Sequence, residues 1–269
     1  MITLRKKPIL ITLLLILCSF AYSVKAKPIN YHLVWSDEFN YRGFPDTTKW
    51  SFATVGNFLH WGNNELQYYT REEKKNAYVS KGNLRIQAIK NGDKITSARL
   101  ESAGKGNWKH ARVEVRAKLA SGRGVWSAIW LLPSNWNFSK GYVDGEIDVA
   151  EYLGFNQDSV FHAVHTYTHN FDRKETNTDA TLVFDSVEAY HVYAVEWNSD
   201  TISFFIDDKL VHSYIRTENL HLRWSFNQPY SLILNVAVGG EWAATKGIDY
   251  DCFPVQMYVD YVRVYEADL

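Results

Sequence analysis

Short apolar runs with a two-residue period constrain the fold of this chain more than any other feature. In ARVEVRAKL (111–119), alanine, valine and leucine alternate with arginine, glutamate and lysine. Successive side chains of a strand point to opposite faces, so this run predicts a strand with one buried face. Five further runs are short and rich in β-branched and aromatic residues: NLRIQAI (83–89), YHVYAVEW (190–197), TISFFID (201–207), YSLILNVAV (230–238) and MYVDYVRVYE (257–266).

Turn-forming residues separate these runs, among them Asn91-Gly92-Asp93, Asn198-Ser199-Asp200 and Asp207-Asp208. No amphipathic helical stretch of three turns, internal repeat or linker interrupts the pattern. The chain has 269 residues, of which 46% are hydrophobic, enough for one large core. Many strands at short spacing therefore predict an all-β protein, a two-sheet sandwich of jelly-roll type.

The N-terminus has the composition of an export signal. A basic start at 5–7 precedes an almost wholly apolar run over 9–24, and Val24-Lys25-Ala26 offers small residues for cleavage. We expect residues 1–26 to be a signal peptide and 27–269 to form a single domain, secreted or periplasmic. A membrane anchor is the alternative, less favoured because the apolar run is slightly short.

Net charge and cysteine content limit which binding partners and disulfides are expected. Loss of the signal would remove Cys18 and leave Cys252 alone, so no internal disulfide is expected. A net charge of −1 gives no electrostatic reason to bind nucleic acid. Nothing in the sequence indicates a protein partner, and we expect a monomer. The 10 tryptophans and 17 tyrosines exceed what a core needs and indicate a groove with exposed aromatic faces.

Three acids in GEIDVAEYLG (145–154) do not fit a regular strand. Glu146 and Asp148 share a face, but Glu151 has the opposite parity and would be buried without a partner. One extra residue, a β-bulge at Val149-Ala150, would bring all three acids to one face. We therefore expect a bulged strand whose acids line a cleft.

Such a row of acids has several possible uses. The Cα atoms of Glu146 and Glu151 would lie about 13 Å apart, and side chains leaning inward could bring the carboxyls to roughly 5–6 Å, as retaining glycoside hydrolysis requires. Asp148 between them would help to keep one glutamate protonated. A calcium cluster or a solvated acidic edge remains an alternative on the motif alone. Trp126 and Trp130, upstream on one strand face, favour a sugar-binding cleft, although they could also lie in the core.

The chain resembles family 16 of the glycoside hydrolases, in its laminarinase-like (endo-1,3-β-glucanase) branch. GEIDVAEYLG is similar to the family's E-x-D-x-x-E signature, and WGNNELQYYT (61–70) to a segment typical of that branch. The likeness extends over nearly all of the expected mature chain. It implies a concanavalin A-like jelly roll and retaining hydrolysis of β-glycans, with no cofactor for catalysis. Glu146 would be the nucleophile, Asp148 an assisting acid and Glu151 the acid/base.

The resemblance also implies positions around the cleft. Expected substrate-binding residues are Trp126, Trp130, Asn64, Arg99, His165, Asn235 and Trp242. Several of these have plainer interpretations: Asn64, with Glu65 beside it, would merely cap a turn, and Arg99 would be an ordinary surface cation. A zinc-type cluster of His162, His165 and His169 is disfavoured, because His162 and His165 point to opposite faces.

A structural calcium ion is a further implication, held by Glu38, the Gly82 backbone and Asp260. Ordinary surface acids are the alternative. Two departures from the family pattern, Ser127 for a common proline and Ala150 for a common methionine, are expected beside the groove and leave fine substrate preference open. We expect β-1,3-glucan as substrate. Mixed-linkage β-glucan, agar-type or carrageenan-type galactans, and a non-catalytic carbohydrate-binding module also stay open.

Overall fold

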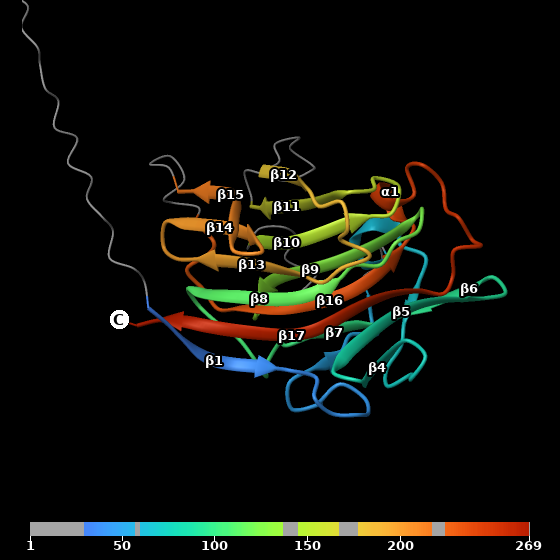
Figure 1. Ribbon diagram of the computed structural model, residues 1–269, viewed down its shortest axis with the longest axis horizontal. Helices are drawn as coiled ribbons and strands as arrows, with labels where there is room; N and C mark the ends of the chain where they lie inside the picture. Colours follow the sequence, from blue (N-terminus) through green and yellow to red (C-terminus); the bar gives the residue numbers. More distant parts are fainter. Residues whose placement is uncertain (1–29, 57–59, 137–144, 167–176, 217–223, 269) are drawn as a thin grey trace, which may run out of the picture.

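The computed structural model describes residues 30–56, 60–136, 145–166, 177–216 and 224–268. The expected signal peptide and His169 lie outside these ranges. Figure 1 shows two twisted sheets of long strands that run in similar directions across the view. Only one short α-helix, α1 (Gly240–Ala243), occurs in the described ranges, so the all-β sandwich is confirmed.

One sheet has ten described strands. Its order is β15 (Lys209–Ile215), β14 (Thr201–Ile206), β13 (His191–Trp197), β8 (Ala111–Lys118), β17 (Val255–Ala267), β5 (Asn83–Asn91), β6 (Lys94–Ser97) and β3 (Tyr68–Tyr69), with β1 (Tyr31–Asp37) paired to β17 and β4 (Ala77–Ser80) to β5. Burial alternates residue by residue along β8, as the sequence predicts. β1 lies along the end of β17, which joins the first and last described strands (Figure 1).

The second sheet has seven described strands. Its order is β12 (Asn177–Leu182), β11 (Ser159–His165), β10 (Glu146–Leu153), β9 (Val125–Pro133), β16 (Tyr230–Val238), β7 (Arg99–Glu101) and β2 (Ser51–Phe52). All nine residues of β16 are buried, and all of β9 except Trp130. Little of these central strands is exposed to solvent, which is consistent with their largely apolar sequences.

The core fills the space between the two sheets. Large, fully buried side chains from both sheets belong to one cluster, including Tyr152 and Ile129 from the seven-stranded sheet and Tyr193, Phe204 and Ile86 from the ten-stranded sheet. Full burial of an aliphatic or aromatic side chain of this size stabilises the fold by roughly 1.5–3 kcal/mol. The inner face of the seven-stranded sheet is thus occupied, and its outer face is left for a site.

Tight turns connect the strands where the sequence predicts them. Asp207 and Asp208 join β14 to β15 with φ values of 49° and 62°, the left-handed conformation that a two-residue hairpin requires. Asn91-Gly92-Asp93 likewise falls between β5 and β6. Within the described ranges, no helix combines the length and apolar character needed to cross a bilayer.

Candidate active site

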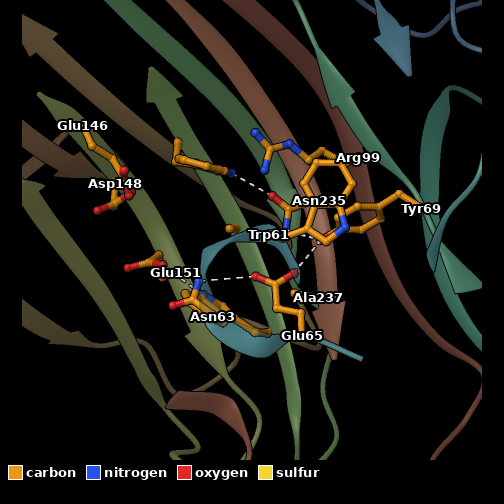
Figure 2. A pocket seen from close by; sticks show the side chains of 13 residues that line it. Trp61, Asn63, Glu65, Tyr69, Arg99, Glu146, Asp148, Glu151, Asn235 and Ala237 are labelled. Atoms are coloured by element: carbon orange, nitrogen blue, oxygen red, sulfur yellow. Dashed lines mark hydrogen bonds between the residues drawn. The ribbon is translucent and has the colours of Figure 1, made fainter. Parts of the chain in front are cut away.

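The three acids lie on β10, and the strand is bulged where the sequence predicts. Asp148 pairs with Ala163 of β11, whereas Glu151, three residues on, pairs with Phe161, only two residues back. The register with β9 also shifts by one residue between Asp148 and Ala150. The extra residue turns Glu151 to the face of Glu146 and Asp148, and all three line one pocket. Figure 2 shows them in a row along one wall.

The pocket lies over the outer face of the seven-stranded sheet. Its lining residues are Trp61, Asn63, Glu65, Tyr69, Arg99, Trp126, Ala128, Trp130, Glu146, Asp148, Glu151, Asn235 and Ala237. They come from β10, β9, β16, β7 and β3 and from the segment around the turn His60–Asn64. In Figure 2 the acids face Trp61, Glu65, Tyr69, Arg99 and Asn235 across the opening. Aromatic and acidic side chains therefore make up much of the pocket lining.

Each acid has defined neighbours. Nε2 of His165 lies 3.0 Å from Oδ2 of Asp148, and both side chains are almost fully buried. Nε1 of Trp126 donates a hydrogen bond of 3.0 Å to Oε1 of Glu151. Glu146 sits beside Asp148 and opposite His165 in the ladder. Glu146, Asp148 and His165 each offer an oxygen or nitrogen within 4.8 Å of the others. The row is thus held by an indole and an imidazole.

Burial and mutual repulsion shift the ionisation of this row. Desolvation, followed by the charge of Asp148, raises the pKa of Glu146 to about 8. The same two causes raise the pKa of Glu151 well above its ordinary value, while the Trp126 hydrogen bond opposes them. Burial also raises the pKa of Asp148. Each ionised carboxylate discourages ionisation of the next, so the row retains a proton near neutral pH. Acid/base catalysis needs such a division between charged and protonated carboxyls.

Arg99 holds the opposite wall together. Its guanidinium carbon lies 4.9 Å from the Trp61 ring centroid and 4.8 Å from that of Trp130. Its Nε donates to Glu101 at 2.8 Å. The side chain is buried, so the ordinary surface cation weighed from the sequence is wrong. Arginine between two indoles fixes both ring planes, because the cation–π attraction acts on each face.

A hydrogen-bonded chain continues from Trp130 along this wall. Trp130 Nε1 donates to Oδ1 of Asn235 at 2.7 Å, and Nδ2 of Asn235 donates to the Tyr69 hydroxyl at 3.1 Å. Asn235 and Trp130 thus both line the pocket and orient one another.

Glu65 is a fourth buried acid, across the pocket from the row. It accepts a hydrogen bond of 2.6 Å from Gln67, with longer contacts of 3.4 Å from Asn63 and 3.5 Å from Tyr69. Burial raises its pKa to about 7, and Gln67 and Arg99 act in the opposite direction. Its side chain, 8% exposed, is aimed into the pocket rather than capping a turn.

Three expected substrate-binding residues lie outside the pocket lining: Asn64, Trp242 and His165, whose Nε2 instead contacts Asp148. Asn64 is exposed and donates to Glu241 at 2.8 Å, whereas its neighbour Asn63 lines the pocket. Asn64 has a positive φ of 55°, within an irregular turn. Trp242, on α1, packs edge-on against Trp126 at 5.3 Å between ring centroids and against Phe161 at 5.2 Å, and so lies beside the pocket on the outer face of the sheet.

The two departures from the family pattern also lie away from the pocket. Ser127 is fully buried on the core-facing side of β9, and its hydroxyl accepts a hydrogen bond from the backbone N–H of Ala120 at 2.9 Å. Ala150, in the bulge, belongs to the core cluster. The expectation that these residues border the groove is therefore wrong, because each has the parity of the inner face.

Two of the three expected calcium ligands, Glu38 and Asp260, are paired with arginines. Both oxygens of Glu38 accept from Arg263 at 2.9 Å, and Oδ2 of Asp260 accepts from Arg116 at 2.5 Å. A calcium ion needs six to eight oxygens, and these carboxylates would have to leave their arginines to contribute. The donor set as it stands does not fit the ion.

Sequence reasoning also missed Trp61, Asn63, Tyr69, Ala128 and Ala237 in the lining. The two-residue period predicts that Ala128 shares a face of β9 with Trp126 and Trp130 and so lines the same pocket. No comparable signal marks Trp61, whose φ of 64° places it in an irregular turn.

Two glutamates that line one pocket beside aromatic side chains provide the pair of carboxyls that glycosidic bond cleavage requires. Jelly-roll fold and pocket together are those of a glycoside hydrolase. The chain belongs to glycosyl hydrolases family 16, whose model matches residues 64–263.

Relatives with known names agree. A β-glucanase of Rhodothermus marinus is 44% identical over 265 residues, covering 93% of this chain and 91% of that protein. The X-ray structure of the laminarinase from Rhodothermus marinus has a TM-score of 0.83 at 42% identity, covering 90% of this chain and 100% of the other. A non-specific endo-β-1,3(4)-glucanase of family 16 matches with a TM-score of 0.83 at 37% identity, covering 90% and 94%.

Proposed function

We propose that this protein is an endo-β-1,3-glucanase that cleaves its substrate with retention of configuration. The bulge that aligns Glu146, Asp148 and Glu151 on one pocket wall is the observation that carries the proposal. Relatives named as a β-glucanase and a laminarinase support a β-glucan as the substrate class. The relative named as a non-specific endo-β-1,3(4)-glucanase makes mixed-linkage glucan the second candidate.

The chemistry divides between the two glutamates. Ionised Glu146 attacks the anomeric carbon while protonated Glu151 gives its proton to the departing glycosidic oxygen. A covalent glycosyl–Glu146 ester forms, and the leaving chain departs as a neutral alcohol. Glu151, now a carboxylate, takes a proton from water, which attacks the same carbon and releases Glu146. Two inversions give net retention.

Asp148 links the two glutamates electrostatically. Its charge raises the pKa of Glu146 and of Glu151, and the electrostatic interaction with His165 lowers both. Protonation of Asp148 as Glu146 ionises would keep the total charge of the row steady. The aspartate thus assists without touching the anomeric carbon.

The character of the pocket argues against a sulfated galactan as substrate and against a non-catalytic binding module. Arg99 is the single cation among its described lining residues, and it is already paired with Glu101. A groove for sulfated galactans needs free positive charge, so a neutral glucan fits better. A binding module gains little from three adjacent acids, two of them buried, which repel one another and cost free energy when ionised.

The test uses protein lacking residues 1–26 and a panel of β-1,3-glucan, mixed-linkage β-glucan, agarose and carrageenan. We expect reducing ends from β-1,3-glucan in an endo pattern, and proton NMR should show the β-anomer first. Activity on agarose or carrageenan with none on either glucan would refute the substrate class. An initial α-anomer would refute retention.

Export belongs to the same proposal. We infer that residues 1–26 are removed and that 27–269 act as one domain, secreted or periplasmic. N-terminal sequencing of the protein recovered outside the cytoplasm should begin at Lys27. An intact N-terminus on membrane-bound protein would instead support an anchor.

A further inference from the structure

The bulge in β10 leaves one residue of β11 facing two. Asp148 pairs with Ala163 and Glu151 with Phe161, so Val149 and Ala150 together oppose His162. A bulge interrupts the ladder, and a backbone carbonyl there needs a partner from elsewhere. His162, the residue opposite this bulge, supplies that hydrogen-bond partner.

His162 bonds directly to the bulge. Its Nδ1 lies 2.7 Å from the carbonyl oxygen of Val149, and its Nε2 lies 3.2 Å from the hydroxyl of Thr181 on β12. The ring is fully buried and lies 5.6 Å, centroid to centroid, from Phe204 of the opposite sheet. The imidazole is therefore fixed on three sides: by the bulge, by the next strand and by the core.

The carbonyl of Val149 can only accept, so Nδ1 carries the hydrogen. Burial lowers the pKa of His162 to about 4, so near neutral pH the ring is uncharged and carries one hydrogen. Nε2 then accepts from Thr181, whose hydroxyl can donate. Both ring nitrogens are thus satisfied in one tautomer, which defines the direction of the bond to Val149.

We propose that His162 is a positioning residue that holds the Val149 bulge and, through it, keeps the Glu151 carboxyl in the pocket. Without the extra residue, the period of two would turn Glu151 to the core. Val149 lies two residues before Glu151, so the carbonyl that His162 holds is next to the step that changes the parity. This inference deepens the proposed function and rests on it, because it assigns the effect to the acid/base glutamate.

The plainer interpretation is a buried histidine that only fills the core. The positioning role and the core-filling role differ in which activity is lost when the Nδ1 donor is removed. A core role affects every reaction of the enzyme alike, whereas loss of Glu151 alignment affects only leaving groups that need a proton. Substrates with and without that need therefore separate the two.

The variants H162N and H162L form a matched pair. Nδ2 of asparagine is as many bonds from Cα as Nδ1 of histidine, so it can donate to Val149. Leucine keeps branched apolar volume and has no donor. Both are compared with wild type on β-1,3-glucan and on a 2,4-dinitrophenyl glycoside of a β-1,3-linked glucose oligomer. The measured quantity is kcat/KM, which reports the glycosylation step.

With H162L, we expect kcat/KM on the glucan to fall about 100-fold, the low end of what a general acid contributes. On the dinitrophenyl glycoside the fall should stay within about threefold, because that leaving group departs without a proton. H162N should stay within about fivefold of wild type on both substrates, since its donor can replace Nδ1. Equal losses on both substrates, no loss on either, or an H162N as impaired as H162L on the glucan would overturn the proposal.

The wild-type protein gives a second test, which stands even if H162L does not fold. Nitrogen-15 NMR of the His162 ring should show hydrogen on Nδ1 and a bare Nε2; the opposite tautomer would overturn the proposal. Wild-type protein inactive on both substrates would refute the proposed function instead, and the tautomer would still be decided separately.

Discussion

Replacing Glu65 by glutamine tests the electrostatics of the pocket without touching the three acids of β10. Burial raises the pKa of Glu65 from 4.5 to about 7. A carboxyl that binds its proton more tightly when folded stabilises the fold at low pH, and this contribution is lost as the pH rises from about 4.5 to about 7. At about 1.4 kcal/mol for each tenfold change in proton affinity, the loss above pH 7 is about 3 kcal/mol.

Glutamine resembles the protonated acid at every pH. The free energies of unfolding of wild type and E65Q should therefore be similar at pH 4, and E65Q should be more stable by about 3 kcal/mol at pH 8. Other ionisable groups are the same in both proteins, so their contributions cancel in the difference.

Urea unfolding followed by tryptophan fluorescence at both pH values measures this difference. E188Q is the matched control, because it makes the same change at an exposed carboxylate outside the pocket lining. It should shift stability by no more than about 0.5 kcal/mol at either pH. If E65Q differs from wild type by the same amount at pH 4 and pH 8, the argument from burial is wrong.

Three further predictions concern the catalytic row and the calcium ion. E146A should abolish turnover of every substrate, whereas E151A should retain activity on a dinitrophenyl glycoside. With added azide, E151A should give a β-glycosyl azide identified by NMR; an α-glycosyl azide would contradict the roles assigned to the two glutamates. W126F removes a donor that lowers the pKa of Glu151, so the alkaline limb of the kcat/KM profile should move to higher pH; a move to lower pH would contradict it. Because arginines already pair with Glu38 and Asp260, chelator in calcium-free buffer should leave the melting temperature unchanged, and a fall would restore the calcium hypothesis.

The strands and the catalytic row were predictable because a two-residue period is a strong local constraint. The run 111–119 alternates in burial throughout β8. At 146–151, the cost of burying an unpaired carboxylate was enough to predict a bulge, and the ladder shows it at the expected residues. Both inferences needed only the parity of side chains and the free energy of a misplaced charge.

The far wall of the pocket was less predictable because it begins in an irregular turn. His60, Trp61 and Asn64 all have positive φ, a backbone conformation that residues other than glycine seldom adopt and that the sequence pattern does not predict. The turn sends Asn63 into the pocket and Asn64 to Glu241. Trp242 as a substrate-binding residue stays a prediction: the half-buried ring lies outside the pocket lining but packs against Trp126, which lines it.

His162 shows how a functional bulge reaches into the core. Parity places His162 and His165 on opposite faces of β11, which made a shared metal site a poor hypothesis. The same parity gives each ring a different partner, because His165 contacts Asp148 on the outer face of the sheet and His162 contacts Val149 in the core. The extra residue that returns Glu151 to the pocket leaves a carbonyl facing the core, where an unmatched acceptor is costly. The proposed catalytic geometry therefore needs a buried polar side chain opposite the bulge. His162 supplies it, because it lies an odd number of residues from His165 and so points to the opposite, core-facing side of β11.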